Sequence, residues 1–195
     1  MKLTILLDSS NTSLTVGLAT NDTLLDSISY EAWQSQSEYM VPELSKLLDK
    51  HNVSYQDIES VVVTIGPGSY TGVRIALTIA KVISTAISCP LFALSSLQVL
   101  QDENKPSICL INARSNRSYF GVYNGNKVIE KDQIKTNDEV MKYISDNSEY
   151  ALCGDLKYLN LPSSNPNVAL NMTRLKDESN KVKDTLGLKP VYLRD

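Results

Sequence analysis

The stretch Gly66-Pro67-Gly68-Ser69-Tyr70-Thr71-Gly72-Val73-Arg74 decides the fold of this chain, because it joins a predicted strand to a predicted helix. It follows the apolar run 61–65, which is typical of a buried strand, and leads into the run 73–87, which favours a helix. Three glycines and a proline permit a tight turn and a close backbone approach. Backbone N–H groups at a helix N-terminus favour anions. Two interpretations stay open: a phosphate-binding loop, or a strand-to-helix connection that needs glycine only for its turn.

The predicted helix 73–87 is apolar on almost every side, since Arg74 and Lys81 are its only charged residues. A helix without a polar face in a soluble protein is buried from more than one side. We expect a second protein to provide the second cover. The alternative is a core helix that its own chain covers.

The remaining sequence predicts an α/β protein of two lobes. Strands at 3–8, 12–19 and 24–30 form an antiparallel meander, and the form Ser35-x-x-Glu38 predicts a capping box for a helix over 36–50. Pro42 is expected to kink this helix or to remove one backbone hydrogen bond. A strand at 90–94 follows the central unit.

The polar stretch 101–106 ends in Pro106 and marks the predicted boundary between a first lobe, 1–104, and a smaller second lobe, 105–195. The second lobe has expected strands at 107–112, 118–123, 127–130 and 149–153, a helix opened by a capping box at 136–139, and an amphipathic segment at 171–183. The order of elements predicts an α/β architecture in which the second lobe is a reduced copy of the first.

Composition restricts the possible functions. A net charge of −3 does not favour a chain that binds nucleic acid unaided. His51 is the only histidine and no CxxC pair is present, which argues against a metal site built on imidazoles or thiolates. The three widely spaced cysteines are expected to be buried thiols in a reducing compartment. The first apolar run stops at Asp8 and no run is long enough to span a bilayer, so we expect a cytoplasmic protein.

The chain resembles the TsaB (YeaZ) family over nearly its whole length. The resemblance rests on five motifs, of which the central one is the most specific: Leu7-Asp8-Ser9-Ser10, Ser37-Glu38, Gly66 to Arg74, Asn112-Ala113-Arg114 and Pro190-Val191-Tyr192-Leu193-Arg194. Two positions depart from the family pattern. Gln36 stands where many members have His, and Asn112 stands where the family has an Asp, so a titrating role there is in doubt.

The resemblance implies an actin-like ATPase fold of the ASKHA, ribonuclease H-like type. It also implies a non-catalytic subunit, without a metal or cofactor of its own. Such a subunit would heterodimerise with TsaD, the homologue that transfers the threonylcarbamoyl group to an adenosine next to the tRNA anticodon. A small ATPase, TsaE, would join the pair, the tRNA would be contacted only indirectly, and the chain alone would form a homodimer.

Candidate site residues fall into two groups. The expected partner or dimer interface lies on the two helices of the first lobe and comprises Glu38, Val41, Leu44, Leu48, Arg74, Ile75, Leu77, Thr78, Lys81 and Val82. A nucleotide contact shared with the partner is expected at Gly66, Pro67, Gly68, Ser69, Tyr70, Thr71, Gly72 and Arg74.

The alternative function is a stand-alone kinase or ATPase of the same fold, with Asp8 as a metal-facing carboxylate at the end of the first strand. We favour a turn-capping role for Asp8, because the following hairpin, Ser9-Ser10-Asn11, has no glycine to hold phosphates. The central loop also lacks the Gly-Lys-Ser/Thr ending of a Walker motif.

Overall fold

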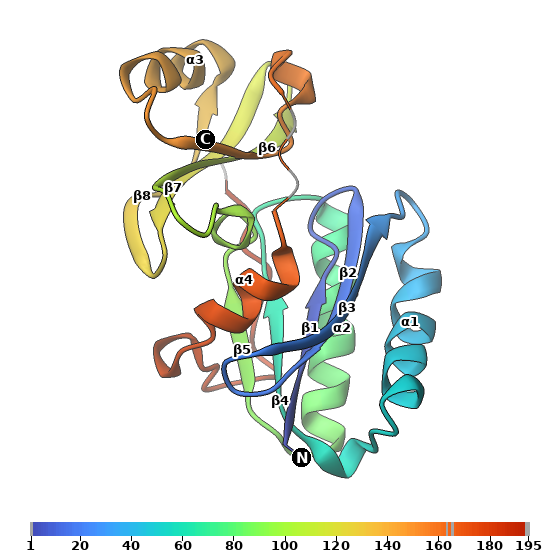
Figure 1. The fold of residues 1–195 in the computed structure, drawn as a ribbon. Coiled ribbons are helices and arrows are strands. Elements are labelled where there is room, and N and C mark those ends of the chain that lie inside the picture. Colours follow the sequence, from blue (N-terminus) through green and yellow to red (C-terminus); the bar gives the residue numbers. More distant parts are fainter. Residues whose placement is uncertain (1, 163, 165, 194–195) are drawn as a thin grey trace.

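The computed structural model describes residues 2–162, 164 and 166–193, and it contains two β-sheets (Figure 1). The first sheet has the order β3-β2-β1-β4-β5. Its strands are β1 (Leu3–Asp8), β2 (Ser13–Ala19), β3 (Leu24–Glu31), β4 (Ile58–Thr64) and β5 (Leu91–Leu94). β1, β2 and β3 are antiparallel, and β4 and β5 continue the sheet parallel to β1. The predicted meander and central strand are therefore confirmed.

Helices cover both faces of this sheet. Side chains along β1 point alternately to its two sides, and because they are apolar on both sides, each side is packed against a helix. Leu3, Ile5 and Leu7 pack toward α1 (Gln36–Lys50) and α2 (Tyr70–Ala86), whereas Leu6 packs toward α4 (Val168–Leu175). Figure 1 shows α1 and α2 on one side of the sheet and α4 on the other. The first lobe is therefore a three-layer α/β/α unit.

The second sheet has the order β8-β7-β6-β9 and one covering helix. Its elements are β6 (Ser107–Arg114), β7 (Arg117–Asn124), β8 (Lys127–Thr136), β9 (Ala151–Gly154) and α3 (Asn137–Asp146). Val140 of α3 packs on Phe120, while Cys109 and Cys153 on the opposite face pack with Leu97 and Leu100 from the first lobe. Short 3₁₀ helices lie at Tyr55–Asp57 (η1), Gln98–Leu100 (η2), Lys157–Leu159 (η3) and Glu178–Asn180 (η4). Within the described residues, no helix is long and apolar enough to span a bilayer.

The predicted extent of the second lobe is wrong at its end, because the chain returns to the first lobe from Val168 onward. Ala169, Met172 and Leu175 of α4 pack on the first sheet, and Asn171 donates hydrogen bonds to the backbone of residues 99 and 101. The amphipathic segment expected to reach residue 183 is helical only to Leu175. Contacts between residues 70 or more positions apart leave no local signal in the sequence, so the predicted boundary at Pro106 gave no indication of this return.

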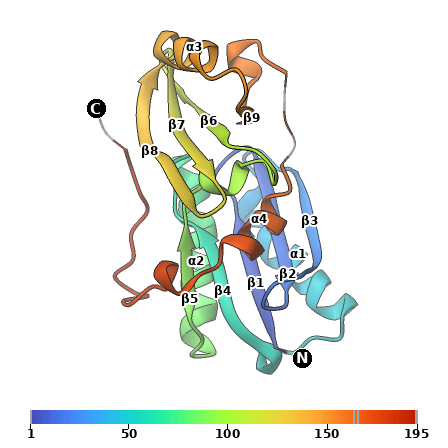
Figure 2. The same cartoon turned by 60° about the vertical axis from the view of Figure 1, so that its left-hand side comes forward.

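A segment that we call the strap, residues 181–192, then follows the edge of the first sheet. Lys181 forms an antiparallel bridge with Phe92, and the Val182 N–H donates to the Leu91 carbonyl over 2.8 Å. The Lys81 ammonium holds the carbonyls of Leu186 and Leu188 over 2.9 and 2.5 Å. Figure 2 shows the strap in dark red along the outside of the first lobe. Arg194, the last residue of the closing motif, lies outside the described residues.

The two predicted capping boxes have different outcomes. Thr136 and Glu139 form the reciprocal pair at the start of α3, as expected. Ser35 makes no side-chain cap on α1, although the helix begins at Gln36 as predicted and continues through Pro42. The turn before α1 is closed by backbone bonds instead, because the Ser35 carbonyl accepts from Glu38 N–H over 3.0 Å.

The expectation that α2 lacks a polar face is also wrong. α2 turns Val73, Ala76, Leu77 and Ala80 inward, and its outward side carries Arg74, Thr78, Val82 and Thr85. Leu77 is 3% exposed, and on α1 Leu44 and Leu48 are 2% and 4% exposed. These three leucines belong to the core of the first lobe, so their expected position on an interface surface is corrected. Val41 and Val82, which are 51% and 63% exposed, are on the surface as expected.

Replacing Leu77 by Ala is expected to lower the free energy of unfolding by about 3 kcal/mol, because the change leaves a cavity among α2, β1 and β4. The matched change Val82→Ala on the outward side of the same helix should cost less than about 0.5 kcal/mol. Urea unfolding followed by circular dichroism measures both. Equal losses in the two variants would contradict the assignment of Leu77 to the core.

Candidate functional site

The loop between β4 and α2 is built against the turn that joins β1 to β2. The Ser69 N–H donates to the Ser10 carbonyl over 2.7 Å, and the Ser9 hydroxyl donates to the Gly72 carbonyl over 2.7 Å. A side chain at Gly68 would overlap the Ser10 carbonyl, and one at Gly72 would overlap the Ser9 carbonyl. Both glycines are therefore required because the two backbone segments pass so close to each other.

The first glycine of the loop has a different neighbour. Gly66 has φ +105°, and a Cβ there would lie 2.6 Å from the carbonyl oxygen of Val191 in the strap. The Val191 N–H donates to the Ile65 carbonyl over 2.7 Å, so the strap and the loop are bonded directly. On its other side Gly66 is paired with Ser96, through its N–H over 3.0 Å and its carbonyl over 2.9 Å. The motif thus joins the first hairpin, the segment after β5 and the strap.

Asp8 caps the turn after β1, as predicted. It is 5% exposed, and its Oδ1 accepts from the Ser10 N–H over 3.1 Å and from the Thr64 hydroxyl. Burial raises the pKa of the Asp8 carboxyl, and the hydrogen bonds from Thr64 and Ser10 oppose that shift. The carboxylate is engaged by its own turn and by the end of β4.

Three of the sequence motifs meet at a pocket of about 760 Å³ between the lobes, which we call the inter-lobe pocket. One wall is the central loop from Gly68 to Thr71, and a second is the start of α1 with Ser37. The end of β6, residues 112–114, forms the third. The other lining residues come from the first turn, the segment before α1, the two helices and the second lobe: Asn11, Thr12, Trp33, Gln34, Gln36, Ile75, Ile111, Tyr119 and Asp155. Trp33, Tyr119 and Asp155 were not predicted, because only the fold brings them to this pocket.

A groove of about 420 Å³ lies between α1 and α2, beside the inter-lobe pocket. Its lining residues are Ser37, Tyr70, Thr71, Arg74, Ile75, Thr78 and Ile79. Four of them, Ser37, Tyr70, Thr71 and Ile75, also line the inter-lobe pocket. Tyr70 is 60% exposed. The wall between the two cavities is therefore formed by the start of both helices.

The predicted nucleotide-contact residues do not all face open space. Gly66, Pro67 and Gly72 are buried in the contacts described above, whereas Gly68, Ser69, Tyr70 and Thr71 line the inter-lobe pocket. Arg74 lies in the second turn of α2 and not in the first, because the helix begins at Tyr70. It lines the groove and not the inter-lobe pocket.

Among the predicted interface residues, Glu38, Val41, Arg74, Thr78 and Val82 are exposed, and Ile75 is half-buried in the groove. Lys81 is held by the strap carbonyls, so its ammonium is already engaged within the chain. His51 follows the last residue of α1, and its Nε2 lies 2.8 Å from Asp26 Oδ2. The hydrogen bond from the Lys50 ammonium, and next that from His51, lower the pKa of Asp26 to about 2.

A kinase of this fold would need carboxylate side chains gathered around a metal ion. Across residues 2–162, 164 and 166–193, no group of three or more His, Cys, Asp and Glu side chains could hold a metal ion. The hairpin that would approach a nucleotide in such an enzyme is bonded instead to the central loop.

Comparison with known proteins identifies the family. The model of the family described as "TsaD: tRNA N6-adenosine threonylcarbamoyltransferase" matches residues 30–177. The chain is 35% identical over 126 residues to the Bacillus subtilis (strain 168) protein named tRNA threonylcarbamoyladenosine biosynthesis protein TsaB, a match that covers 62% of this chain and only 55% of that protein. It is 30% identical to Uncharacterized protein MG208 of Mycoplasma genitalium, over 88% of this chain and 84% of that protein.

A solved structure titled "YeaZ from Pseudomonas aeruginosa" superposes with a TM-score of 0.84 over 99% of this chain and 100% of that one, at 21% identity. The fold is therefore the actin-like ATPase fold. Within that class, the chain belongs to the TsaB (YeaZ) family, and the transferase family model that it matches shows that TsaB and TsaD chains are related.

Replacing Gly72 by Ala is expected to destabilise the chain by at least about 2 kcal/mol, because the new methyl group overlaps the Ser9 carbonyl. This outcome opposes the intrinsic preference of a helix for Ala over Gly, which is about 1 kcal/mol. The control is Thr78→Ala on the exposed side of α2, which should leave thermal unfolding nearly unchanged. A Gly72→Ala variant as stable as the wild type would contradict this expectation, because it would show that the loop and the first hairpin can move apart without loss of stability.

Proposed function

We propose that this chain is a non-catalytic subunit that pairs with the threonylcarbamoyl transferase and supports threonylcarbamoyladenosine modification of tRNA next to the anticodon. The observation that carries the proposal is that the central loop and the first hairpin hold each other, through Gly68 and Gly72 against Ser9 and Ser10. In a kinase of this fold these segments would hold phosphates. Curated relatives named for tRNA threonylcarbamoyladenosine biosynthesis support the pathway.

The exposed side of α1 and α2 is the proposed pairing surface. Glu38 lies in the first turn of α1 and is exposed, and Arg74 on α2 is exposed and lines the groove, so this surface carries charges of both signs. A partner of the same fold that docks through its own equivalent helices forms a twofold interface, in which each contact made by this surface is repeated from the partner's side. The same geometry accounts for a homodimer of the isolated chain.

A nucleotide contact, where the pair has one, is proposed at the inter-lobe pocket and shared with the partner. Ser69, Tyr70 and Thr71 present the start of α2 to that pocket, and Arg114 supplies a cation from the second lobe. The chain then needs no cofactor of its own. A TsaE-like ATPase would join the pair in the cytoplasm, and the tRNA would be bound mainly by the transferase, in keeping with the net charge of −3.

Adding this chain to the purified transferase and its ATPase is expected to raise threonylcarbamoyladenosine formation on tRNA well above the level without it. The control is a chain unfolded by heat. Equal modification with and without the native chain would contradict the proposal. ATP hydrolysis by the pure chain that disappears in the Asp8→Ala variant would favour the kinase alternative instead.

A charge on the outward side of α2 should weaken pairing. Val82→Asp places a carboxylate at a site that is 63% exposed, so the variant should fold normally and shift the sedimentation profile of the isolated chain toward the monomer. The matched control is Met141→Asp on α3, which is 41% exposed and belongs to the second lobe. Identical profiles for wild type and Val82→Asp would argue against this surface.

A further inference from the structure

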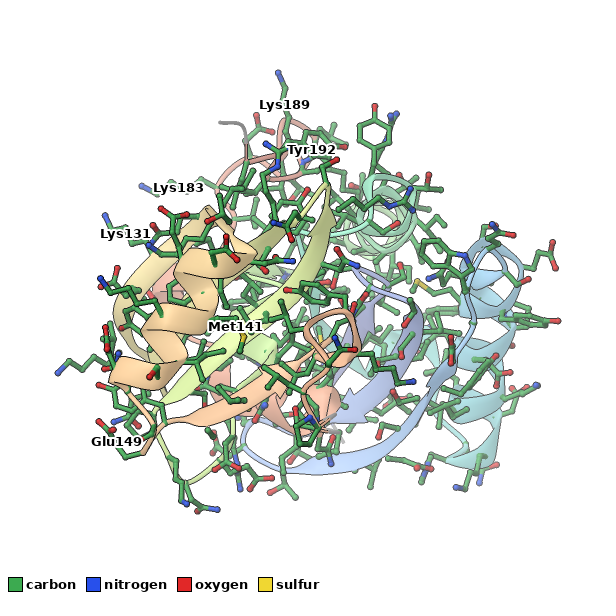
Figure 3. The ribbon with its side chains drawn as sticks, turned by 90° about the horizontal axis from the view of Figure 1, so that it is seen from above. Lys131, Met141, Glu149, Lys183, Lys189 and Tyr192 are labelled. Carbon is green, nitrogen blue, oxygen red and sulfur yellow. The ribbon has the colours of Figure 1, made fainter. Side chains whose placement is uncertain are left out.

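The strap brings one aromatic side chain to the pairing surface. The ring of Tyr192 stacks on the ring of Tyr70, with centroids 5.0 Å apart and planes inclined by 24°. Tyr70 is the first residue of α2, and it lines both the groove and the inter-lobe pocket. Figure 3 shows Tyr192 on the side of the molecule where the strap runs, away from Glu149 of the second lobe.

Tyr70 in turn holds Arg74. The Arg74 Nη1 group donates a hydrogen bond to the Tyr70 hydroxyl over 2.7 Å, and its guanidinium carbon lies 5.2 Å from the centroid of the same ring. Residues four apart on a helix are surface neighbours, so Tyr70 and Arg74 can make both contacts without distortion. The three side chains form a row in the order Tyr192, Tyr70, Arg74.

The row is not part of the core. Tyr192 is 42% exposed and Tyr70 is 60% exposed, so their stacking buries too little area to decide stability. The backbone next to Tyr192 is fixed, because the Val191 N–H donates to the Ile65 carbonyl. Lys81, which lies two turns after Arg74 on α2, also holds the strap through two of its carbonyls. A well-anchored strap thus supports an exposed row of side chains.

Fixing an arginine before a partner arrives has a direct consequence for affinity. A free arginine side chain loses conformational freedom on binding, and a side chain already held in place loses less. Arginine and tyrosine are also the residue types that dominate binding energy at protein interfaces. The row therefore fits a docking role better than a structural one.

We propose that Tyr192 is a positioning residue for the partner subunit: by holding Tyr70, it fixes the Arg74 guanidinium beside the groove for a carboxylate of the docking subunit. This inference rests on the proposed function. The occupant is the transferase of the proposed function, because curated relatives are named for tRNA threonylcarbamoyladenosine biosynthesis. A carboxylate is the group whose charge complements the fixed guanidinium.

The test measures the affinity of the full chain for the purified transferase by isothermal titration calorimetry. Tyr192→Ala is expected to weaken binding about five- to tenfold, because the freed Arg74 side chain must then be ordered on binding. Tyr192→Phe keeps the ring and should bind within twofold of the wild type. Leu186→Ala, at a strap residue that is 73% exposed and outside the row, is the matched control and should also bind within twofold.

A double-variant cycle separates positioning from general packing. In an Arg74→Gln background, Tyr192→Ala should change affinity less than twofold, because the group that Tyr192 positions has been removed. An equal loss in both backgrounds, or wild-type affinity for Tyr192→Ala, would overturn the inference while leaving the proposed function intact. A wild-type chain that did not bind the transferase would contradict the proposed function and this inference together.

Discussion

The structure depends on the close approach of two backbone segments, the turn after β1 and the loop before α2. Ser9 and Ser10 pass so near Gly68 and Gly72 that neither glycine could carry a side chain, and hydrogen bonds of 2.7 Å close the contact from both sides. This contact fixes where α2 begins and therefore where its outward side lies. The strap adds to it at Gly66, so the turn after β1 and the strap both meet this one loop.

The same contact supports the docking role that we propose for this ATPase-type fold. The loop is hydrogen-bonded at two points to the hairpin that would hold phosphates in a kinase of this fold. Here Asp8 is enclosed by Ser10 and Thr64, which uses the carboxylate for the turn itself. What remains open is the other side of the loop, where Gly68 to Thr71 border the inter-lobe pocket and the first turns of α2 border the groove. A pairing function needs only these outward surfaces.

The sequence predicted most helices and strands well. It predicted less well which of their sides are buried and which distant segments pack together. Strand and helix patterns are local, so β1 and α1 were predicted to the residue, whereas β4 begins three residues before its predicted start. Apolar residues at helical spacing do not show which side meets the core, and so Leu44, Leu48 and Leu77 were placed on a surface when they are buried. The return of α4 to the first sheet and the stacking of Tyr192 on Tyr70 join residues at least 70 positions apart, which no local pattern reports. The closing motif was the one available signal for the latter.

Hydrogen exchange at the Ser69 amide tests the central claim most directly. If the loop is held by the first hairpin, this amide should exchange slowly in the isolated chain, close to the rate set by global unfolding, because its N–H is bonded to the Ser10 carbonyl. Addition of ATP and magnesium to the isolated chain should leave the rate unchanged. Fast exchange in the free chain that slows when the nucleotide is added would contradict the account, because it would show a loop that opens to hold phosphates.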